Sequence, residues 1–251
     1  MSVMRRFQER MRNQGKVLAE LPAARRKNAG PQGTGVLAGK QLEEFLSASL
    51  AEDLAALKSI SSVERKIAHK RDTLLPKYAP YVERLEESSA THELLGYYLV
   101  WLFDAGNIDE AVQFADYCLE NGVKLPERFQ SDIRFFVASK IMEWAEKEQE
   151  AGRSVDPYFG HIWSQAQADP EAWNLPDDLL ARKSRLKGLI AEQRGDLSSA
   201  EGYLAVALER GAKVKTALDR VRKKITAGGA ASAGAPEGDS PESAPEKKAG
   251  E

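Results

Sequence analysis

Two groups of basic residues are the side chains in this sequence best suited to binding chemistry. One group is Lys66, Lys70 and Arg71, whose i, i+4 and i+5 spacing places them on one side of a helix. Clustered Lys and Arg side chains neutralise nucleic-acid phosphates, so both groups are candidate DNA-binding residues. The other group lies near the N-terminus and consists of Arg5, Arg6, Arg10, Arg12, Lys16, Arg25, Arg26 and Lys27.

The charge is distributed unevenly along the chain. Residues 1–40 carry a net charge of +7, residues 41–226 carry −6, and residues 227–251 carry −3. A short basic arm on an acidic body is typical of a protein that binds a polyanion at one end. The alternative is a solvated basic tail without a ligand.

Other kinds of site have little support in the sequence. There is no GxxxxGK[ST] motif for nucleotide phosphates, and His69, His92 and His161 stand apart from one another and from any metal-binding pattern. Cys118 is the only cysteine, which excludes a disulfide within the chain and favours a buried structural role over a nucleophilic one. We expect no catalytic residue, no metal site and no cofactor.

Carboxylates and aromatic residues each allow two interpretations. Asp104 and Asp109, or Asp177 and Asp178, could contribute to a magnesium site, but their positions at turns and helix starts favour capping. An aromatic group could stack on bases, but its helical spacing favours packing between helices. That group consists of Tyr97, Tyr98, Trp101, Phe103, Phe114 and Tyr117.

The segment LAALKSISSVERKIAHKRDTLLPKYAPYV, residues 54–82, carries a family resemblance. It resembles the small terminase subunit of tailed bacteriophages, the GpM family, in the pattern LKxIxSxxxKxxxKRxxLLPxYxPYV. The matched positions are Leu57, Lys58, Ile60, Ser62, Lys66, Lys70, Arg71, Leu74, Leu75, Pro76, Tyr78, Pro80, Tyr81 and Val82.

The resemblance implies a non-membrane protein of the bacterial host cytoplasm that forms a ring homo-oligomer. Such a protein selects concatemeric double-stranded viral DNA and delivers it to the large ATPase–nuclease subunit. The family is often described with endonuclease activity, although cleavage in terminases generally belongs to the large subunit. Residues 227–251 are acidic here, where several members have basic tails, which favours binding of the large subunit over DNA for this tail.

The basic residues at 66–71 must be positioned by the helices around them. An apolar stripe begins near Gln41 and predicts a long amphipathic helix that breaks at Ser59–Ser62. A second, basic helix should follow to about Leu75, where Pro76 and Pro80 stop it. The stripe could pack on the chain's own core or form the seam between subunits. Its residues are Leu42, Phe45, Leu46, Leu50, Leu54 and Leu57.

Two later segments predict helical hairpins of one design. Residues 96–122 and 187–211 each place a Gly-Asn or Gly-Asp turn between two apolar helices, with an alanine after the turn for close packing. In the second hairpin, Ser198 and Glu201 form a capping-box pattern. Further helices are expected over residues 130–151 and 155–168.

The sequence therefore predicts an all-α protein with tetratricopeptide-like hairpins after a long oligomerisation helix and with disordered termini. No apolar run approaches the roughly 18 residues of a membrane helix. The expected domains are a basic arm (1–21), a flexible linker (22–40), a helical region for oligomerisation and DNA contact (41–88), a hairpin domain (89–226) and a disordered tail (227–251). The alternative functions are a tetratricopeptide-like interaction scaffold without DNA binding and a nuclease in its own right.

Overall fold

The structure is a computed structural model that describes the backbone of residues 36–233 and the side chains of residues 39–227. This part of the chain contains helices and no strand, so the all-α prediction is confirmed. The arm (1–21), most of the linker (22–40) and the end of the tail (234–251) lie outside the described residues.

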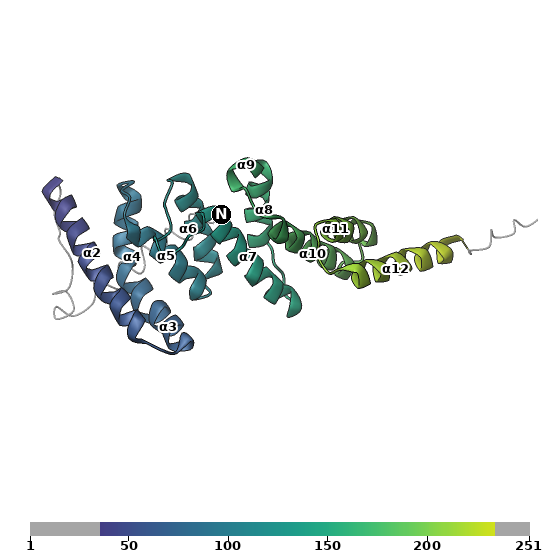
Figure 1. Cartoon of the computed structure of the whole chain (residues 1–251), viewed down its shortest axis with the longest axis horizontal. Helices are drawn as coiled ribbons and strands as arrows, with labels where there is room; N and C mark the ends of the chain where they lie inside the picture. Colours follow the sequence, from purple (N-terminus) through teal and green to yellow (C-terminus); the bar gives the residue numbers. More distant parts are fainter. Residues whose placement is uncertain (1–35, 234–251) are drawn as a thin grey trace, which may run out of the picture. The chain divides into compact units, whose positions relative to one another are not determined.

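The chain divides after Leu175 into two compact units, which we call the N-terminal unit and the C-terminal unit. The C-terminal unit contains α10 (Asp177–Gln193), α11 (Leu197–Glu209) and α12 (Lys215–Ala233). In the N-terminal unit, α5 contacts α2, α4 and α6 (Figure 1). The elements of the N-terminal unit are α2 (Val36–Ser59), α3 (Val63–His69), the π-helix η2 (Lys70–Leu74), α4 (Leu75–Glu87), α5 (Glu93–Asp104), α6 (Ile108–Glu120), α7 (Ile133–Glu150), α8 (Tyr158–Ala168) and α9 (Pro170–Trp173).

The predicted break at Ser59–Ser62 is confirmed. Helix α2 ends at Ser59, whose hydroxyl donates to the Ala56 carbonyl at 2.7 Å. Ser62 then caps α3 by accepting a hydrogen bond from the Arg65 N–H at 3.3 Å. Both hydroxyls bond to the nearby backbone, which is why serines favour helix ends over helix interiors. At its other end α2 begins at Val36, earlier than the Gln41 that the stripe indicates.

The prediction that Pro76 and Pro80 stop the helix is wrong. The chain is helical without interruption from α3 through η2 to the end of α4 at Glu87. Pro76 lies in the first turn of α4, directly after the π-helix, and Pro80 lies inside α4. The π turn changes the hydrogen-bonding pattern ahead of Pro76: the N–H of Leu75 bonds to the carbonyl of Lys70, five residues back. A proline in the first turn needs no intrahelical donor, so the helix continues.

Two tyrosines of this region pack α4 against α2. The Tyr78 side chain is fully buried, and its hydroxyl donates to Asp53 of α2 at 2.6 Å. The Tyr81 ring lies 5.8 Å from the ring of Phe45, also on α2, measured between centroids. Burial is the main reason that the pKa of Tyr78 is raised. Tyr78 and Tyr81 of the motif that carries the family resemblance therefore fix the junction of α2 and α4.

The apolar stripe of α2 lies partly in the chain's own core. Leu46, Leu50 and Leu57 are buried within the N-terminal unit, whereas Leu42, Phe45 and Leu54 are half-buried. Packing on the chain's own core therefore accounts for the three buried leucines of the stripe. Assembly through the remaining three side chains stays a prediction.

Both predicted hairpins are present as α5–α6 and α10–α11. Gly106 and Gly195 end the first helix of each pair with φ values of 76° and 80°, which a side chain would strain. Ala111 and Ala200 are fully buried after the turns, so the close packing expected there is confirmed. The capping-box prediction is wrong, because Asp196 caps α11 by accepting from the Ser199 N–H at 3.0 Å. Ser198 lies inside the helix.

The C-terminal unit has its own small core of alanine and aliphatic residues. Gly188 of α10 lies so close to α11 that an added Cβ would be 2.7 Å from Leu204 Cγ. Helix α12 is fastened to α10 by Glu192, whose carboxylate bonds to Arg220 at 2.6 Å and to Lys224 at 2.8 Å. It extends to Ala233, beyond residue 226, where the sequence predicts the end of the hairpin domain.

Candidate nucleic-acid interface

Most of the predicted DNA-binding residues lie outside the described part of the chain. Only the second basic group can be placed. The residues outside are Arg5, Arg6, Arg10, Arg12, Lys16, Arg25, Arg26 and Lys27.

Lys66, Lys70 and Arg71 have different surroundings instead of forming one uniform cationic face. The Lys70 ammonium lies 2.6 Å from the Asp104 carboxylate at the end of α5, and the two side chains are only 14% and 28% exposed. Arg71 pairs with the neighbouring Asp72 at 2.8 Å, on the exposed surface. Hydrogen bonding between them raises the pKa of Arg71 and lowers the pKa of Asp72. Lys66 has no ion-pair partner among the described residues.

The Lys66 side chain instead lines a hollow of about 410 Å³ in the surface of the N-terminal unit. We call it the cationic hollow, and define it by the residues that line it. These are Leu54, Leu57, Lys58, Lys66, Lys70, Tyr97 and Arg128.

Five separate segments contribute the polar side chains of the cationic hollow, and Lys70 of η2 is one of these side chains. Lys58 comes from the last turn of α2, and Lys66 comes from α3, after the break at the serines. Tyr97 comes from α5, and Arg128 comes from the loop between α6 and α7. The Arg128 guanidinium carbon lies 5.0 Å from the centre of the Tyr97 ring, a cation–π contact. The Tyr97 ring in turn lies 6.0 Å from Trp101.

The electrostatics of the cationic hollow favour an anion. Lys58, Lys66 and Arg128 form no ion pair within residues 39–227, whereas the fourth cation of the lining, Lys70, pairs with Asp104. Leu54 and Leu57 supply an apolar wall, which weakens dielectric screening of the cations. Three cations beside the half-buried Tyr97 ring can hold the phosphates of a nucleic-acid backbone.

Sequence reasoning missed Lys58 and Arg128 and assigned Tyr97 to packing. Lys58 could have been found, because it belongs to the family pattern and lies four residues after Leu54, at the next step of the leucine stripe. Arg128 has no signal in the sequence, since only the tertiary fold brings its loop to α5. Tyr97 is half-buried and serves both packing and the wall of the hollow.

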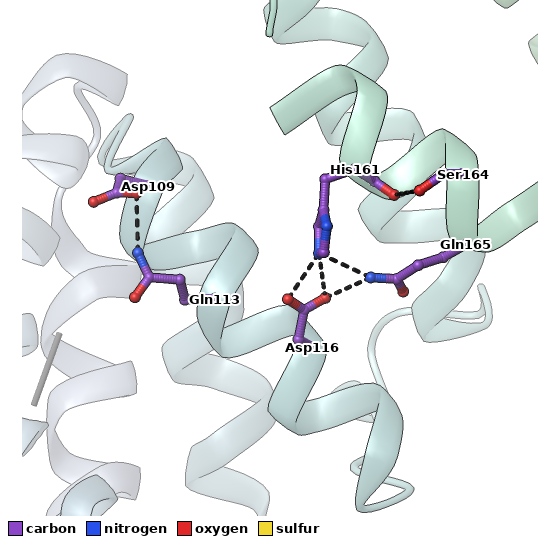
Figure 2. A network of polar contacts seen from close by, with 6 residues as sticks. All are labelled: Asp109, Gln113, Asp116, His161, Ser164 and Gln165. Carbon is purple, nitrogen blue, oxygen red and sulfur yellow. Dashed lines mark hydrogen bonds and ion pairs between the residues drawn. The ribbon is translucent and has the colours of Figure 1, made fainter. Parts of the chain in front are cut away.

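A second polar cluster joins α6 to α8. Figure 2 shows Asp116 of α6 facing His161 and Gln165 of α8. The Asp116 carboxylate lies 2.8 Å from His161 Nε2 and accepts from Gln165 Nε2 at 2.7 Å. About two turns earlier on α6, Asp109 accepts from Gln113 at 2.9 Å and from the Tyr158 hydroxyl at 3.2 Å. The cluster holds two helices together through exposed and half-buried groups.

The remaining candidates for chemistry have structural partners or are buried. Cys118 is fully buried, and burial raises the pKa of its thiol. His92 caps α5 by accepting from the Leu94 N–H at 3.0 Å. Asp177 pairs with Arg210 at 3.1 Å. In residues 39–227, no three His, Cys, Asp or Glu side chains gather closely enough to hold a metal ion.

The span that contains the cationic hollow also matches a known family. A family profile described as "Phage small terminase subunit" matches residues 47–178, just over half of the chain. The chain belongs to the phage small terminase subunit family. The sequence-based recognition of this family is thus confirmed, and the match ends where the C-terminal unit begins.

Two curated relatives carry terminase names. The "Probable terminase, endonuclease subunit" of Haemophilus phage HP1 is 31% identical over 143 residues, which cover 56% of this chain and 50% of the relative. The "Terminase, endonuclease subunit" of Escherichia phage P2 is 28% identical over 186 residues, which cover 72% of this chain and 74% of the relative. The match thus spans only half the length of the Haemophilus phage protein. The chain has no significant match among solved structures. None of the helices within residues 36–233 combines the length and apolar character needed to cross a membrane.

Proposed function

We propose that this chain is the DNA-recognition subunit of a phage packaging terminase, and that the cationic hollow contacts the backbone of double-stranded viral DNA. The observation that carries the proposal is the gathering of Lys58, Lys66 and Arg128 around one hollow, without carboxylate partners in the described chain, inside the span that matches the family. Their contacts are with phosphates, which position the duplex without reading its bases.

The rest of the function follows from the family and the charge distribution. The basic arm with Arg5, Arg6 and the other N-terminal cations adds further phosphate contacts. A ring homo-oligomer repeats each weak site around its axis, so that avidity supplies affinity. The protein acts in the cytoplasm of the bacterial host and delivers DNA to the large ATPase–nuclease subunit, which binds the acidic tail.

The salt dependence of DNA binding tests the proposal. Fluorescence anisotropy with a labelled duplex gives the slope of log Kobs against log salt, and each lost phosphate contact lowers its magnitude by roughly 0.9. We expect a Lys58→Gln, Lys66→Gln, Arg128→Gln variant to lose roughly 2–3 units of slope while keeping its helical circular dichroism. The control variant Lys124→Gln, Lys147→Gln, Arg153→Gln removes equal charge elsewhere in the same unit. Equal slopes for the two variants would refute a role for the hollow.

Endonuclease activity is a second candidate, because the names of both relatives contain the words "endonuclease subunit". No residue of this chain is assigned to it. Nicking of supercoiled plasmid by the purified chain alone, dependent on added magnesium, would support this candidate. Nicking only with the large subunit present would assign cleavage to that partner.

A further inference from the structure

The walls of the cationic hollow are more apolar than a site for phosphates alone requires. Leu54 and Leu57 lie three residues apart on α2, so they share one side of that helix, and both line the hollow. Tyr97 of α5 adds a half-buried aromatic ring. A charged phosphate is not stabilised by contact with carbon, so these walls fit a second, apolar part of the ligand.

The size of the hollow leads to the same conclusion. Its volume of about 410 Å³ lies within the roughly 300–1,000 Å³ that small-molecule sites occupy. A DNA duplex is too wide to enter such a space, so its backbone reaches the exposed cations, such as Lys58 and Arg128, and leaves the interior free. The interior therefore has room for a smaller group that is attached to the same backbone.

Arg128 is held in place for stacking before any ligand arrives. Its guanidinium carbon lies 5.0 Å from the centre of the Tyr97 ring and 4.9 Å from the centre of the Phe129 ring. Within residues 39–227 no carboxylate pairs with it. Guanidinium planes and aromatic rings are the surfaces on which proteins stack nucleic-acid bases. Because the arginine is already ordered, less conformational entropy is lost when a base binds.

The bases of an intact duplex cannot use these surfaces. Each paired base has its faces covered by its neighbours in the stack, and only its edges are open in the grooves. An unpaired nucleotide exposes the face of its base and carries its own phosphate. It therefore matches both the apolar walls and the cations of the hollow.

We infer that the cationic hollow takes one unpaired nucleotide of DNA. Its base packs against the leucines of α2 and the Tyr97–Arg128 pair, and its phosphate is held by Lys58 and Lys66. The inference rests on the proposed function for DNA as the ligand. An unpaired nucleotide comes either from a single-stranded overhang at a duplex end or from a base extruded from the duplex. The overhang is favoured, because an extruded base must first lose its pairing and stacking.

Two matched DNA probes separate the base from the phosphate. One is a labelled duplex with a short single-stranded overhang, and the other has the same overhang built from abasic nucleotides, which keep every phosphate. In fluorescence anisotropy, we expect the full chain to bind the overhang with bases roughly tenfold more tightly than the abasic one. The salt slopes should be equal, since the phosphates are the same.

Leu54→Asn tests whether the preference for bases comes from the hollow. This variant makes the wall polar and removes no charge, so it should abolish the preference and keep the wild-type salt slope. Leu42→Asn is the matched control, because Leu42 is also a half-buried leucine of the α2 stripe but does not line the hollow. It should keep the preference, and its loss in both variants would overturn the inference. Circular dichroism checks that both variants remain helical.

A blunt duplex distinguishes the two sources of the nucleotide. Equal binding of the blunt duplex by the wild-type chain and Leu54→Asn would identify the overhang as the source, whereas weaker binding by Leu54→Asn would identify an extruded base. If the wild-type chain binds both overhangs equally and Leu54→Asn binds every probe like wild type, the inference is refuted while the proposed function stands. If the wild-type chain binds no probe, both are refuted.

Discussion

Replacing Lys70 with Met tests whether this residue serves the fold and not the ligand. Its ammonium lies 2.6 Å from the Asp104 carboxylate, and the two side chains are 14% and 28% exposed. Exposed ion pairs contribute about 0–1 kcal/mol, whereas removing one partner of a fully buried pair costs about 3–5 kcal/mol. Intermediate burial therefore places the cost of Lys70→Met at about 2 kcal/mol of unfolding free energy. Met keeps the apolar stem but leaves the Asp104 carboxylate without its cation.

Tryptophan fluorescence during urea unfolding measures this cost in the relevant part of the molecule. All four tryptophans belong to the N-terminal unit, so the signal excludes the C-terminal unit. A loss of about 2 kcal/mol corresponds to a Tm about 4–8 °C lower for a unit of this size. Asp104→Asn and the double variant complete a thermodynamic cycle, in which we expect a coupling of about 1–2 kcal/mol.

Lys66→Met is the matched control, because Lys66 lines the cationic hollow and forms no ion pair within the described chain. It should keep wild-type stability and lower the magnitude of the salt slope by roughly one unit. The opposite result for the two lysines would refute the reasoning. A Lys70→Met protein with unchanged unfolding and a lower salt slope would mean that Lys70 contacts DNA instead of holding Asp104.

Three further predictions concern packing and pH. Gly188→Ala should destabilise the C-terminal unit by about 1–2 kcal/mol in thermal melts followed by circular dichroism, because its Cβ would overlap Leu204, while Gly202→Ala, with no atom within 4 Å, should stabilise α11 by up to about 1 kcal/mol. Hydrogen bonds from Arg220, the largest effect, lower the pKa of Glu192 from 4.5 to about 2, so the stability it provides is complete above pH 4.5 and is lost as pH falls toward 2. Glu192→Gln should make the melting temperature depend less on pH between 4.5 and 2. Burial, followed by repulsion from Glu83 and Glu87, raises the pKa of Glu86 from 4.5 to about 7, so stability should fall as pH rises between these values. Glu86→Gln should then melt higher than wild type at pH 8 and equally below pH 4.5, and a wild-type advantage at pH 8 would contradict this.

Local signals in the sequence were enough for the break after α2 and for the turns of the two hairpins. Ser62 and Gly106 act through hydrogen bonds and backbone angles within a few residues, so their effects can be read without knowing the fold. The prediction at Pro76 was wrong because a π turn precedes this proline and lets the helix continue. No residue pattern in the sequence predicts that turn.

The candidate site was only partly predictable for the same reason. Lys66 belongs to a basic cluster that helical spacing reveals, but the same spacing could not tell that Lys70 turns to Asp104. Arg128 joins the cationic hollow only because α5 and the loop before α7 meet in the folded chain. A side chain's ionic partner depends on tertiary contacts, and these lie beyond the range of a helical repeat.

The π-helix at Lys70–Leu74 has a consequence for the evolution of this protein. A π turn contains one residue more than the α-helix around it requires, and loss of that residue would rotate the preceding segment by about 100° about the helix axis. Lys66 would swing out of the hollow, while the buried face of α4 would stay in place. A single inserted or deleted codon could therefore add Lys66 to the cationic hollow or remove it between phage lineages, a larger step than any one substitution provides.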